Sequence, residues 1–425
     1  MELRDPVYGF IFVNELERDI LNSFAFQRLR RIKQLGLTDM IYHGANHNRF
    51  EHSIGVMHLA SQMFDAIISR EQNRRLLKDM LKIDDTGFAR DRQLVRLAAL
   101  LHDVGHAPFS HASEDIMPHN PRTGKPYQHE DYSVAVIDNY LKDVIEKHDL
   151  NQNYHITVAE IAALITGNKA VLRSRAFWKV LISSQLDADR SDYLMRDSLH
   201  IGVKYGIYDY HRLLNVLAVA ADPASGSVIL GLEDGGWHVA ESVVIARYHM
   251  FKQVYFHRVR CAYDYHLKNF MAKILPNGKL PAPTDSESYL TYDDVFIWHM
   301  LLENRYDVDA QAILNRNYIR RIFSLPDIPS SADTQQLERV KMELNRRGIW
   351  FEEIRSEKLW YSLFVEGDPH KEIMIIDERT RIPKPLSFYS PLIQNIGAIR
   401  KSRLYVKPED SSKAEAFLPD IQKKA

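Results

Sequence analysis

The chain has 425 residues, of which 45% are hydrophobic, and its formal net charge is −1. This composition predicts a globular protein with a sizeable core, and the near-zero charge excludes a global basic field for nucleic acid or a membrane surface. Cys261 is the single cysteine, which excludes an internal disulfide and suits a reducing cytoplasm. The sequence has no apolar run of membrane-spanning length and no secretory signal, so we expect a cytoplasmic protein.

Helices dominate the first part of the chain. Apolar residues at helical spacing predict helices over residues 15–35, 49–70, 94–105, 130–147, 157–166 and 175–200. Two β-rich runs flank Asp-Gly-Gly within residues 227–241, which is typical of a β-hairpin. A long amphipathic helix is then expected over residues 243–275.

A segment rich in Pro, Ser and Gly, residues 276–290, is the predicted linker. Beyond it the sequence indicates helices and then strand-like runs, over residues 291–305, 335–347, 358–365, 372–377 and 402–407. We therefore expect a mainly α protein with a small β-hairpin and a smaller C-terminal α+β lobe. The predicted division is a core at 1–275, the linker at 276–290, the lobe at 291–410 and a tail at 411–425.

Histidines and aspartates gather in the first part of the chain in a way that suits a metal ion. His102 and Asp103 are adjacent at a predicted helix end, and consecutive helical side chains point about 100° apart, so both reach one ion only if it sits between them. His52, on another helix, is the candidate second histidine. The candidates for a further carboxylate are Asp187, Asp189, Asp192 and Asp197. Two histidines and two carboxylates suit Fe, Mn, Mg or Zn with open positions for water or phosphate.

A lone histidine or a bare His-Asp pair is more often structural, and the ordered combination of motifs carries the argument. The segments DPVYG, FQRLRRIKQLG, NRFEHSIGV, LLHDVGHAPFSH, HE and DRSDYLMRD follow one another between Asp5 and Asp197. In this order they resemble the dNTP triphosphohydrolase branch of the HD-domain superfamily, which includes the sterile-alpha-motif and HD-domain-containing dNTPase and its bacterial relatives. The resemblance extends to about Leu275, and it implies that Asp189 is the fourth metal ligand beside His52, His102 and Asp103.

The resemblance also implies a substrate site for a deoxynucleoside triphosphate. Its phosphate-binding positions fall on Arg49, Arg190, Arg247 and Arg258. A triphosphate carries about four negative charges, which such a set of cations would offset. Gln34 and Asp197 match positions that hold the 3′-hydroxyl. Leu35 and Tyr255 match positions that crowd the 2′ carbon, and Tyr193 matches one that stacks near the sugar and base. On one long helix, Arg247, Tyr255 and Arg258 would share a face.

The expected reaction is metal-assisted attack of water on the α-phosphate, which releases a deoxynucleoside and inorganic triphosphate. The leaving 5′-oxygen needs a proton, and histidine is the usual donor near neutral pH. His111 is the first candidate donor, with Glu114 one helical step further on to orient it. His106, His129 and Glu130 would form a second acid–base cluster.

Family habit implies a homodimer or homotetramer, and in the animal enzyme a regulatory guanine nucleotide assembles the tetramer. Gln27 and Arg30 match that guanine site, but Met1 replaces its Lys and Asn22 replaces its Asp, so GTP-specific activation is not expected here. Activation by a deoxynucleotide, the base preference and the identity of the metal are left open.

Two alternatives to this function remain. One is another HD-type activity, such as a nucleotidase, phosphodiesterase or nuclease, because the metal ligands alone do not separate these. The other is a module that senses nucleotides or binds nucleic acid without turnover, and the complete set of candidate ligands and histidines argues against this loss of activity.

Overall fold

The computed structural model of the protein describes residues 1–358, 372–395 and 399–422. The chain forms two compact units. The first contains Met1–Met250, Lys279–Phe296 and the described part of Tyr361–Ile396. The second contains Phe251–Gly278 and the described parts of Ile297–Trp360 and Gly397–Ala425. The domain boundaries predicted from the sequence stay predictions.

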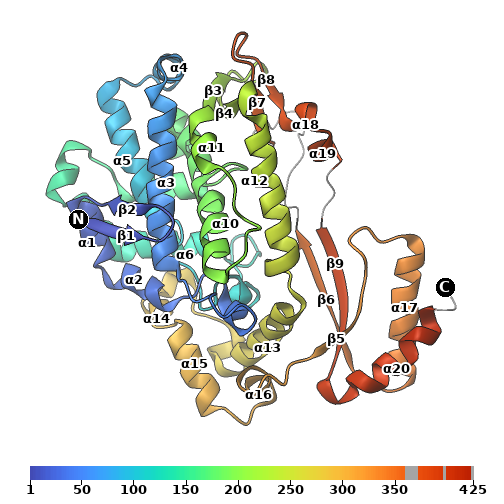
Figure 1. Ribbon diagram of the computed structural model, residues 1–425. Coiled ribbons are helices and arrows are strands. Elements are labelled where there is room, and N and C mark those ends of the chain that lie inside the picture. The colour runs from blue at the N-terminus through green and yellow to red at the C-terminus, as the bar shows by residue number, and fades with distance from the viewer. Residues whose placement is uncertain (359–371, 396–398, 423–425) are drawn as a thin grey trace. The chain divides into compact units, whose positions relative to one another are not determined.

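The first unit is mainly helical, as the sequence predicts (Figure 1). Helix α3 (Arg49–Ser69) packs against both α5 (Asp85–Leu101) and α10 (Ala188–Ile201). The other helices of this unit are α1 (Glu15–Leu21), α2 (Phe24–Gln27), α4 (Glu71–Leu81), α6 (His129–Val136), α7 (Lys142–Glu146), α8 (Val158–Thr166), α9 (Lys169–Leu172), α11 (Tyr210–Val216), α12 (Trp237–Met250), α14 (Ser286–Leu290), α18 (Leu386–Tyr389) and α19 (Pro391–Gln394). Strands β1 (Glu2–Asp5) and β2 (Gly9–Phe12) form a hairpin at its N-terminal end.

Two of these helices begin at strong caps. At the start of α3, the Asn48 side chain accepts hydrogen bonds from the backbone N–H groups of Phe50 and Glu51, and the Glu51 carboxylate accepts one from the Asn48 N–H at 3.1 Å. At the start of α10, the Asp187 carboxylate accepts from the backbone N–H of Arg190 at 2.6 Å. The caps fix which residues occupy the first turns of the two helices.

Helix α5 ends at Leu101, so His102 is its C-cap and Asp103 lies in the turn that follows. Gly105 allows this turn to approach α6, because a Cβ atom at this position would lie 2.1 Å from the backbone nitrogen of Ser133. The Gly105 N–H donates to Ser133 Oγ at 3.0 Å, and Ser133 Oγ donates to the His102 carbonyl at 2.8 Å. The turn that holds His102 and Asp103 is therefore anchored on both sides.

The hairpin predicted around Asp-Gly-Gly is wrong, although a hairpin lies beside it. Strand β4 (Val228–Glu233) pairs antiparallel with the preceding strand β3 (Leu217–Ala221), and Trp237 begins helix α12. Strands β7 (Met374–Ile376) and β8 (Pro383–Pro385) extend this sheet in the order β3–β4–β7–β8, with β7 parallel to β4. The second run was misassigned because a β-branched residue such as Val239 also fits the buried face of a helix.

The long helix predicted over residues 243–275 is interrupted. Helix α12 ends at Met250, a π-helical segment covers Phe251–Tyr255, and α13 (Arg258–Ile274) begins after His257. His257 has extended backbone angles, and its side chain accepts a hydrogen bond from the Val259 N–H at 3.3 Å. A new N-cap thus stands within the predicted helix, and Arg247, Tyr255 and Arg258 do not share one face of a single helix.

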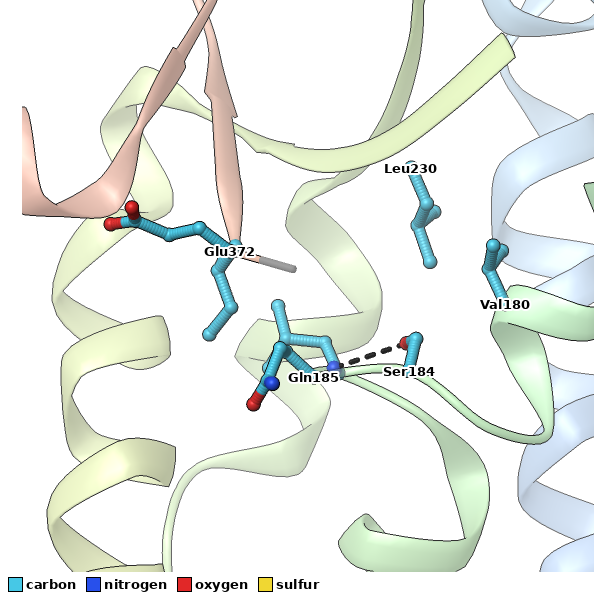
Figure 2. Close-up of a pocket in the computed structure, with 7 residues that line it drawn as sticks. Val180, Ser184, Gln185, Leu230 and Glu372 are labelled. Atoms are coloured by element: carbon cyan, nitrogen blue, oxygen red, sulfur yellow. Dashed lines mark hydrogen bonds between the residues drawn. The ribbon is translucent and has the colours of Figure 1, made fainter. Parts of the chain in front are cut away.

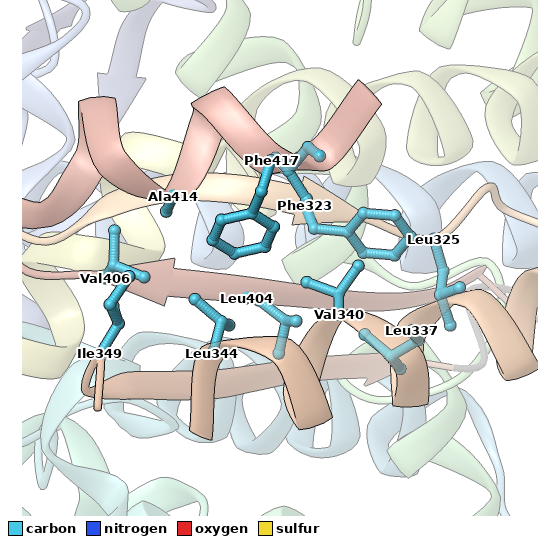
Figure 3. Packing of buried hydrophobic residues seen from close by; sticks show 11 residues of the cluster. Phe323, Leu325, Leu337, Val340, Leu344, Ile349, Leu404, Val406, Ala414 and Phe417 are labelled. Carbon is cyan, nitrogen blue, oxygen red and sulfur yellow. The ribbon is translucent and has the colours of Figure 1, made fainter. Parts of the chain in front are cut away.

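The second unit combines helices with antiparallel strands, which confirms the predicted α+β lobe. Its strands pair in the order β5 (Arg320–Ser324), β9 (Ile399–Val406) and β6 (Phe351–Lys358). Its helices are α13, most of α15 (Asp294–Glu303), α16 (Val308–Leu314), α17 (Ser331–Arg346) and α20 (Ser411–Gln422). Side chains of α17, α20 and the strands meet in one core, which includes Phe323, Leu404 and Phe417 (Figure 3).

Two predictions in the C-terminal third have different outcomes. Residues 411–422 form helix α20 where the sequence indicated a tail, and Ala414, Phe417 and Leu418 are buried. The sequence did not indicate this helix because it contains Pro419 and has few apolar residues. The strand-like run at 358–365 lies outside the described residues except for Lys358, the end of β6. Among the described residues, no helix has both the length and the apolar character needed to cross a bilayer.

Candidate metal centre

The four predicted metal ligands lie together in the first unit. His52 comes from α3, His102 and Asp103 from the end of α5, and Asp189 from the first turn of α10. Nε2 of His52 lies 3.1 Å from Asp189 Oδ1 and 3.6 Å from Asp103 Oδ2. Nε2 of His102 lies 3.4 Å from Asp103 Oδ1 and 3.8 Å from Asp189 Oδ1. Ligand atoms of His52, His102 and Asp103 thus all lie within 4.8 Å of one another, and Asp189 adjoins both histidines.

The hydrogen bonds of the two histidines direct both Nε2 atoms toward this cluster. His102 Nδ1 lies 2.7 Å from the carbonyl oxygen of Ala99, which can only accept, so Nδ1 carries a proton. His52 Nδ1 lies 2.8 Å from Asp192 Oδ2, which accepts in the same way. Among the described residues, His102 Nε2 is a buried atom with no hydrogen-bond partner. A buried lone pair beside two carboxylates fits a divalent cation.

The charges of the cluster also fit a bound cation. Burial alone would lower the pKa of His52, but its hydrogen bonds with Asp189 and Asp192 raise it to about 10. Burial alone would raise the pKa of Asp189 and of Asp103, but the neighbouring histidines hold both below their ordinary values. The two carboxylates therefore favour positive charge at this cluster, which a divalent ion held there would supply.

Two further predicted histidines adjoin Asp103, and a third, His111, packs against one of them. Nε2 of His106 lies 3.6 Å from Asp103 Oδ1, and Nε2 of His129 lies 3.9 Å from that oxygen. The rings of His106 and His129 are stacked at 4.2 Å, and the ring of His111 meets that of His106 edge-on at 5.1 Å. Burial, together with Arg49 and His129, lowers the pKa of His106 well below its usual range, so this ring is neutral.

The two predicted glutamates stand behind these histidines. Glu114 Oε1 lies 2.6 Å from His111 Nδ1, and Glu130 Oε2 lies 3.5 Å from His129 Nδ1. Burial would raise the pKa of Glu114, but its hydrogen bonds with His111 and His129 lower it below the ordinary value. Half of the His111 side chain is exposed, so its ring remains accessible to a ligand. The arrangement provides a carboxylate-oriented imidazole next to the candidate metal cluster.

The predicted phosphate-binding arginines fall into three groups. Arg49 is buried beside the metal cluster, where its Nη1 bonds Asp103 and its Nε donates to Ser110 Oγ at 3.0 Å. Arg190 and Arg247 both act electrostatically on Tyr193, and burial raises the pKa of that tyrosine against their influence. Arg258 belongs to the second unit, as does Tyr255, and the predicted roles of these two residues stay predictions.

The predicted sugar residues are joined by a histidine that sequence reasoning missed. His47 Nε2 lies 2.7 Å from Asp197 Oδ1, and the His47 carbonyl accepts the backbone N–H of Gln34 at 3.0 Å. Within the described residues, Oε1 of Gln34 is buried without a hydrogen-bond partner, and Leu35 is also buried. The position of His47, two residues before Arg49 in the same histidine-rich segment, was the available signal.

A small pocket lies near the start of α10 (Figure 2). It is lined by Val180, Ser184, Gln185, Leu186, Leu230, Glu372 and Ile373. None of these is a predicted ligand, but Gln185 Oε1 accepts a hydrogen bond from Arg247 Nη1 at 3.2 Å. One wall of the pocket thereby helps to place a predicted substrate-binding arginine.

Comparisons with known proteins agree with this site. The chain matches the HD-domain family model over residues 49–170 and that of the HD-associated region over residues 208–346. YwfO of Bacillus subtilis strain 168 is 38% identical over 91% of this chain and 81% of its own length. A Dictyostelium discoideum homologue of the deoxynucleoside triphosphate triphosphohydrolase SAMHD1 is 33% identical over 60% of this chain and 46% of its own length.

A solved structure extends the agreement to the fold. The phosphohydrolase of Bacteroides thetaiotaomicron superposes with a TM-score of 0.69 at 26% identity, covering 96% of this chain and 99% of that one. The resemblance predicted from the ordered motifs is thereby confirmed. The chain belongs to the HD-domain phosphohydrolase family.

Proposed function

We propose that this protein hydrolyses deoxynucleoside triphosphates to a deoxynucleoside and inorganic triphosphate. The observation that carries the proposal is the convergence of His52, His102, Asp103 and Asp189, with a further histidine cluster on one side of Asp103. Relatives named deoxynucleoside triphosphate triphosphohydrolases support the substrate class. A divalent ion held by these four residues would supply Lewis acidity at the α-phosphate and make water a better nucleophile.

Arginines would bind the triphosphate. Arg49 lies beside Asp103, and Arg190 and Arg247 lie near Tyr193, so cationic groups are available from two directions. Guanidinium groups form bidentate hydrogen bonds with phosphate and stay charged at all relevant pH values. We assign Arg258 the same role from the family resemblance.

The deoxyribose would be held by Gln34 and Asp197. His47 supports this pairing, because its ring contacts Asp197 and its backbone carbonyl accepts the backbone N–H of Gln34, so one residue links two positions that are far apart in sequence. Leu35 would crowd the 2′ carbon with an apolar side chain, which disfavours a ribose hydroxyl, and we assign Tyr255 the same crowding role from the family resemblance. Tyr193 would pack near the sugar and base.

In the chemical step, water attacks the α-phosphorus and the bond from this phosphorus to the 5′-oxygen breaks. The leaving 5′-oxygen takes a proton from His111, whose ring Glu114 orients through the 2.6 Å contact. The attacking water gives up its proton to solvent, and His111 takes one back from solvent before the next turnover. His106 and His129, between His111 and Asp103, would contact the phosphate oxygens as charge develops there. Glu130 would support His129.

Product analysis tests this function. The protein is loaded with Mn²⁺, Fe²⁺, Mg²⁺ or Zn²⁺ in turn and incubated with each of the four dNTPs, singly and mixed, and the products are separated by anion exchange. The expected products are deoxynucleoside and intact triphosphate. Pyrophosphate, orthophosphate or a nucleoside monophosphate would instead identify another HD-type phosphohydrolase.

Two further outcomes address the remaining alternatives. Salt-dependent binding of single-stranded nucleic acid without any nucleotide turnover would favour a binding module. Turnover only in dNTP mixtures would indicate activation by a deoxynucleotide. The predicted homodimer or homotetramer is tested in the same samples by light scattering with and without dNTPs.

A further inference from the structure

Behind His52 lies a buried chain of charged residues that the proposed chemistry does not use. It consists of Asp192 and Arg196 of α10 and Asp5 at the end of β1. Their side chains are at most 5% exposed. Three charged side chains so deeply buried are costly to desolvate, and such pairs often contribute nothing net to stability. Their place against a candidate metal ligand therefore calls for a second explanation.

These residues form a continuous series of hydrogen bonds that links the N-terminal hairpin to the imidazole of His52. Asp5 Oδ2 accepts from Arg196 Nη1 at 2.9 Å. Arg196 then donates to both oxygens of Asp192, from Nε to Oδ2 at 2.8 Å and from Nη2 to Oδ1 at 2.9 Å. Asp192 Oδ2 also accepts from His52 Nδ1 at 2.8 Å. Each link is a charge-assisted hydrogen bond of good length.

The Asp192 carboxylate accepts hydrogen bonds from both Arg196 and His52. Both of its oxygens are occupied, and it bonds the nitrogen of His52 that does not face the candidate metal cluster. The backbone of α3 packs closely against this pair, because a Cβ atom on Gly55 would lie 2.1 Å from Asp192 Oδ1 and 2.2 Å from Arg196 Nη2. The pair therefore packs directly against the helix that carries His52, and Asp192 contacts that ring on the side away from the candidate metal cluster.

We propose that Asp192, clamped by Arg196 and Asp5, is the positioning residue that fixes the ring orientation and the protonated nitrogen of His52 for metal binding. The inference rests on the metal site of the proposed function. A carboxylate that accepts the Nδ1–H of a ligating histidine holds its tautomer and makes Nε2 a better ligand. Because Asp5 completes the clamp, the N-terminal hairpin also contributes to the geometry of the metal site.

Metal affinity tests the proposal without relying on turnover. The full chain is stripped with a chelator, and Mn²⁺ binding is measured by the electron paramagnetic resonance signal of the free ion. For Asp192→Asn we expect the dissociation constant to rise by about 10- to 100-fold, the usual effect of losing such an outer carboxylate. Circular dichroism and melting of the metal-free protein check that the variant is folded.

The first unit offers a matched control in Asp91, another fully buried aspartate. Asp91 accepts from Trp178 Nε1 at 2.9 Å and pairs with Arg175 Nε at 2.8 Å, and it has no contact with His52. Asp91→Asn should lower the melting temperature of the metal-free protein as Asp192→Asn does, yet leave the Mn²⁺ dissociation constant within about twofold. Equal affinities for Asp192→Asn and Asp91→Asn would overturn the proposal.

If Asp192→Asn does not fold, Asp5→Asn decides the question. This change removes one carboxylate from Arg196 and leaves the Asp192 bond to His52 in place, so a smaller loss of affinity, about threefold or more, is expected. Unchanged Mn²⁺ affinity in Asp5→Asn would then refute the clamp. Wild-type protein that binds no Mn²⁺ would instead refute the metal site of the proposed function, which is a separate result.

Discussion

The candidate metal centre and the Glu17–Arg96 network are both buried charged clusters in the first unit, but they differ in how they are completed. Glu17 accepts from Arg96 Nε at 2.6 Å and from Arg96 Nη2 at 2.7 Å, and it also accepts from Gln93 and from the Asn14 backbone. Arg96 in turn donates to Ser61 Oγ and to the Phe12 carbonyl. Both charged side chains of this network, Glu17 and Arg96, are thus paired with each other and hydrogen-bonded to other protein groups.

The metal centre is not closed in this way. Among the described residues, His102 Nε2 and both ring nitrogens of His106 are buried without a hydrogen-bond partner. The Asp103 carboxylate lies beside both rings, and that of Asp189 lies beside His102. Residues of similar type thus differ in whether their hydrogen-bonding positions are filled, and the unfilled positions, rather than the charges themselves, are what make the first cluster a candidate ligand site.

Asp189→Ala should disrupt the candidate metal centre and have the largest effect on activity. The loss of one ligand is expected to abolish tight metal binding and to lower kcat by at least about 100-fold, since metal catalysis is worth several kcal/mol. The metal-free protein should unfold within about 1 kcal/mol of wild type, because the Asp189 side chain is one-third exposed. Steady-state kinetics and urea unfolding measure both quantities, and full activity in this variant would remove Asp189 from the site.

His111→Gln separates chemistry from metal binding within the same cluster. We expect kcat to fall by about 100-fold or more, the usual contribution of a general acid, while Mn²⁺ affinity stays at the wild-type value. The reason is that His111 pairs with Glu114 and lies at the exposed edge of the histidine cluster. A kcat within threefold of wild type would assign the proton transfer to another group.

Glu17→Ala tests the closed network and should show the opposite pattern. The change leaves Arg96 buried without its carboxylate, so the free energy of unfolding should fall by about 3–5 kcal/mol. The activity of the folded fraction should not change. The paired variant Glu17→Leu/Arg96→Met should regain most of the lost stability, because a closed ion pair can be exchanged for apolar packing. A loss of metal affinity in either variant would contradict this division of roles.

The sequence predicted the candidate site better than it predicted its surroundings. His102 and Asp103 are neighbours in the chain, and the Asn48 and Asp187 caps set the starts of α3 and α10, so local rules place these residues well. The choice of Asp189 over Asp187 came from the family resemblance. Asp187 turns out to be the N-cap of α10, a role that its own position could have indicated.

Contacts between distant segments were the part that sequence patterns missed. Asp192 was considered only as a possible metal ligand, and nothing local shows that it bonds the far nitrogen of His52. His47 was overlooked because its partner, Asp197, lies 150 residues away. Helix α12 was partly assigned to a hairpin, since β-branched residues fit a strand or a buried helix face, and the tertiary environment decides between them.

The hydrogen-bonded network around Glu353, near the surface, gives a third case for the comparison. Changing it should have the smallest effect on the free energy of unfolding. In the second unit, hydrogen bonds from Arg355, and then from Lys341 and Ser402, lower the pKa of Glu353 to about 2 despite partial burial. Between the ordinary value of 4.5 and about 2, the unfolded chain therefore binds more protons at this position than the folded one. The stability from Glu353 is complete above pH 4.5 and is lost as the pH falls toward 2.

Glu353→Gln should accordingly flatten the decline of unfolding free energy between pH 5 and the lowest pH at which the protein stays folded. The change in slope should be small, because Arg355 is largely exposed and water screens its charge. Glu338→Gln is the control, since Glu338 also contacts Lys341 but from an exposed position. If Glu353→Gln steepens the acid slope instead, the network is not closed around Glu353, and the rule that hydrogen-bond completion marks structural charges would need to be restricted to the protein interior.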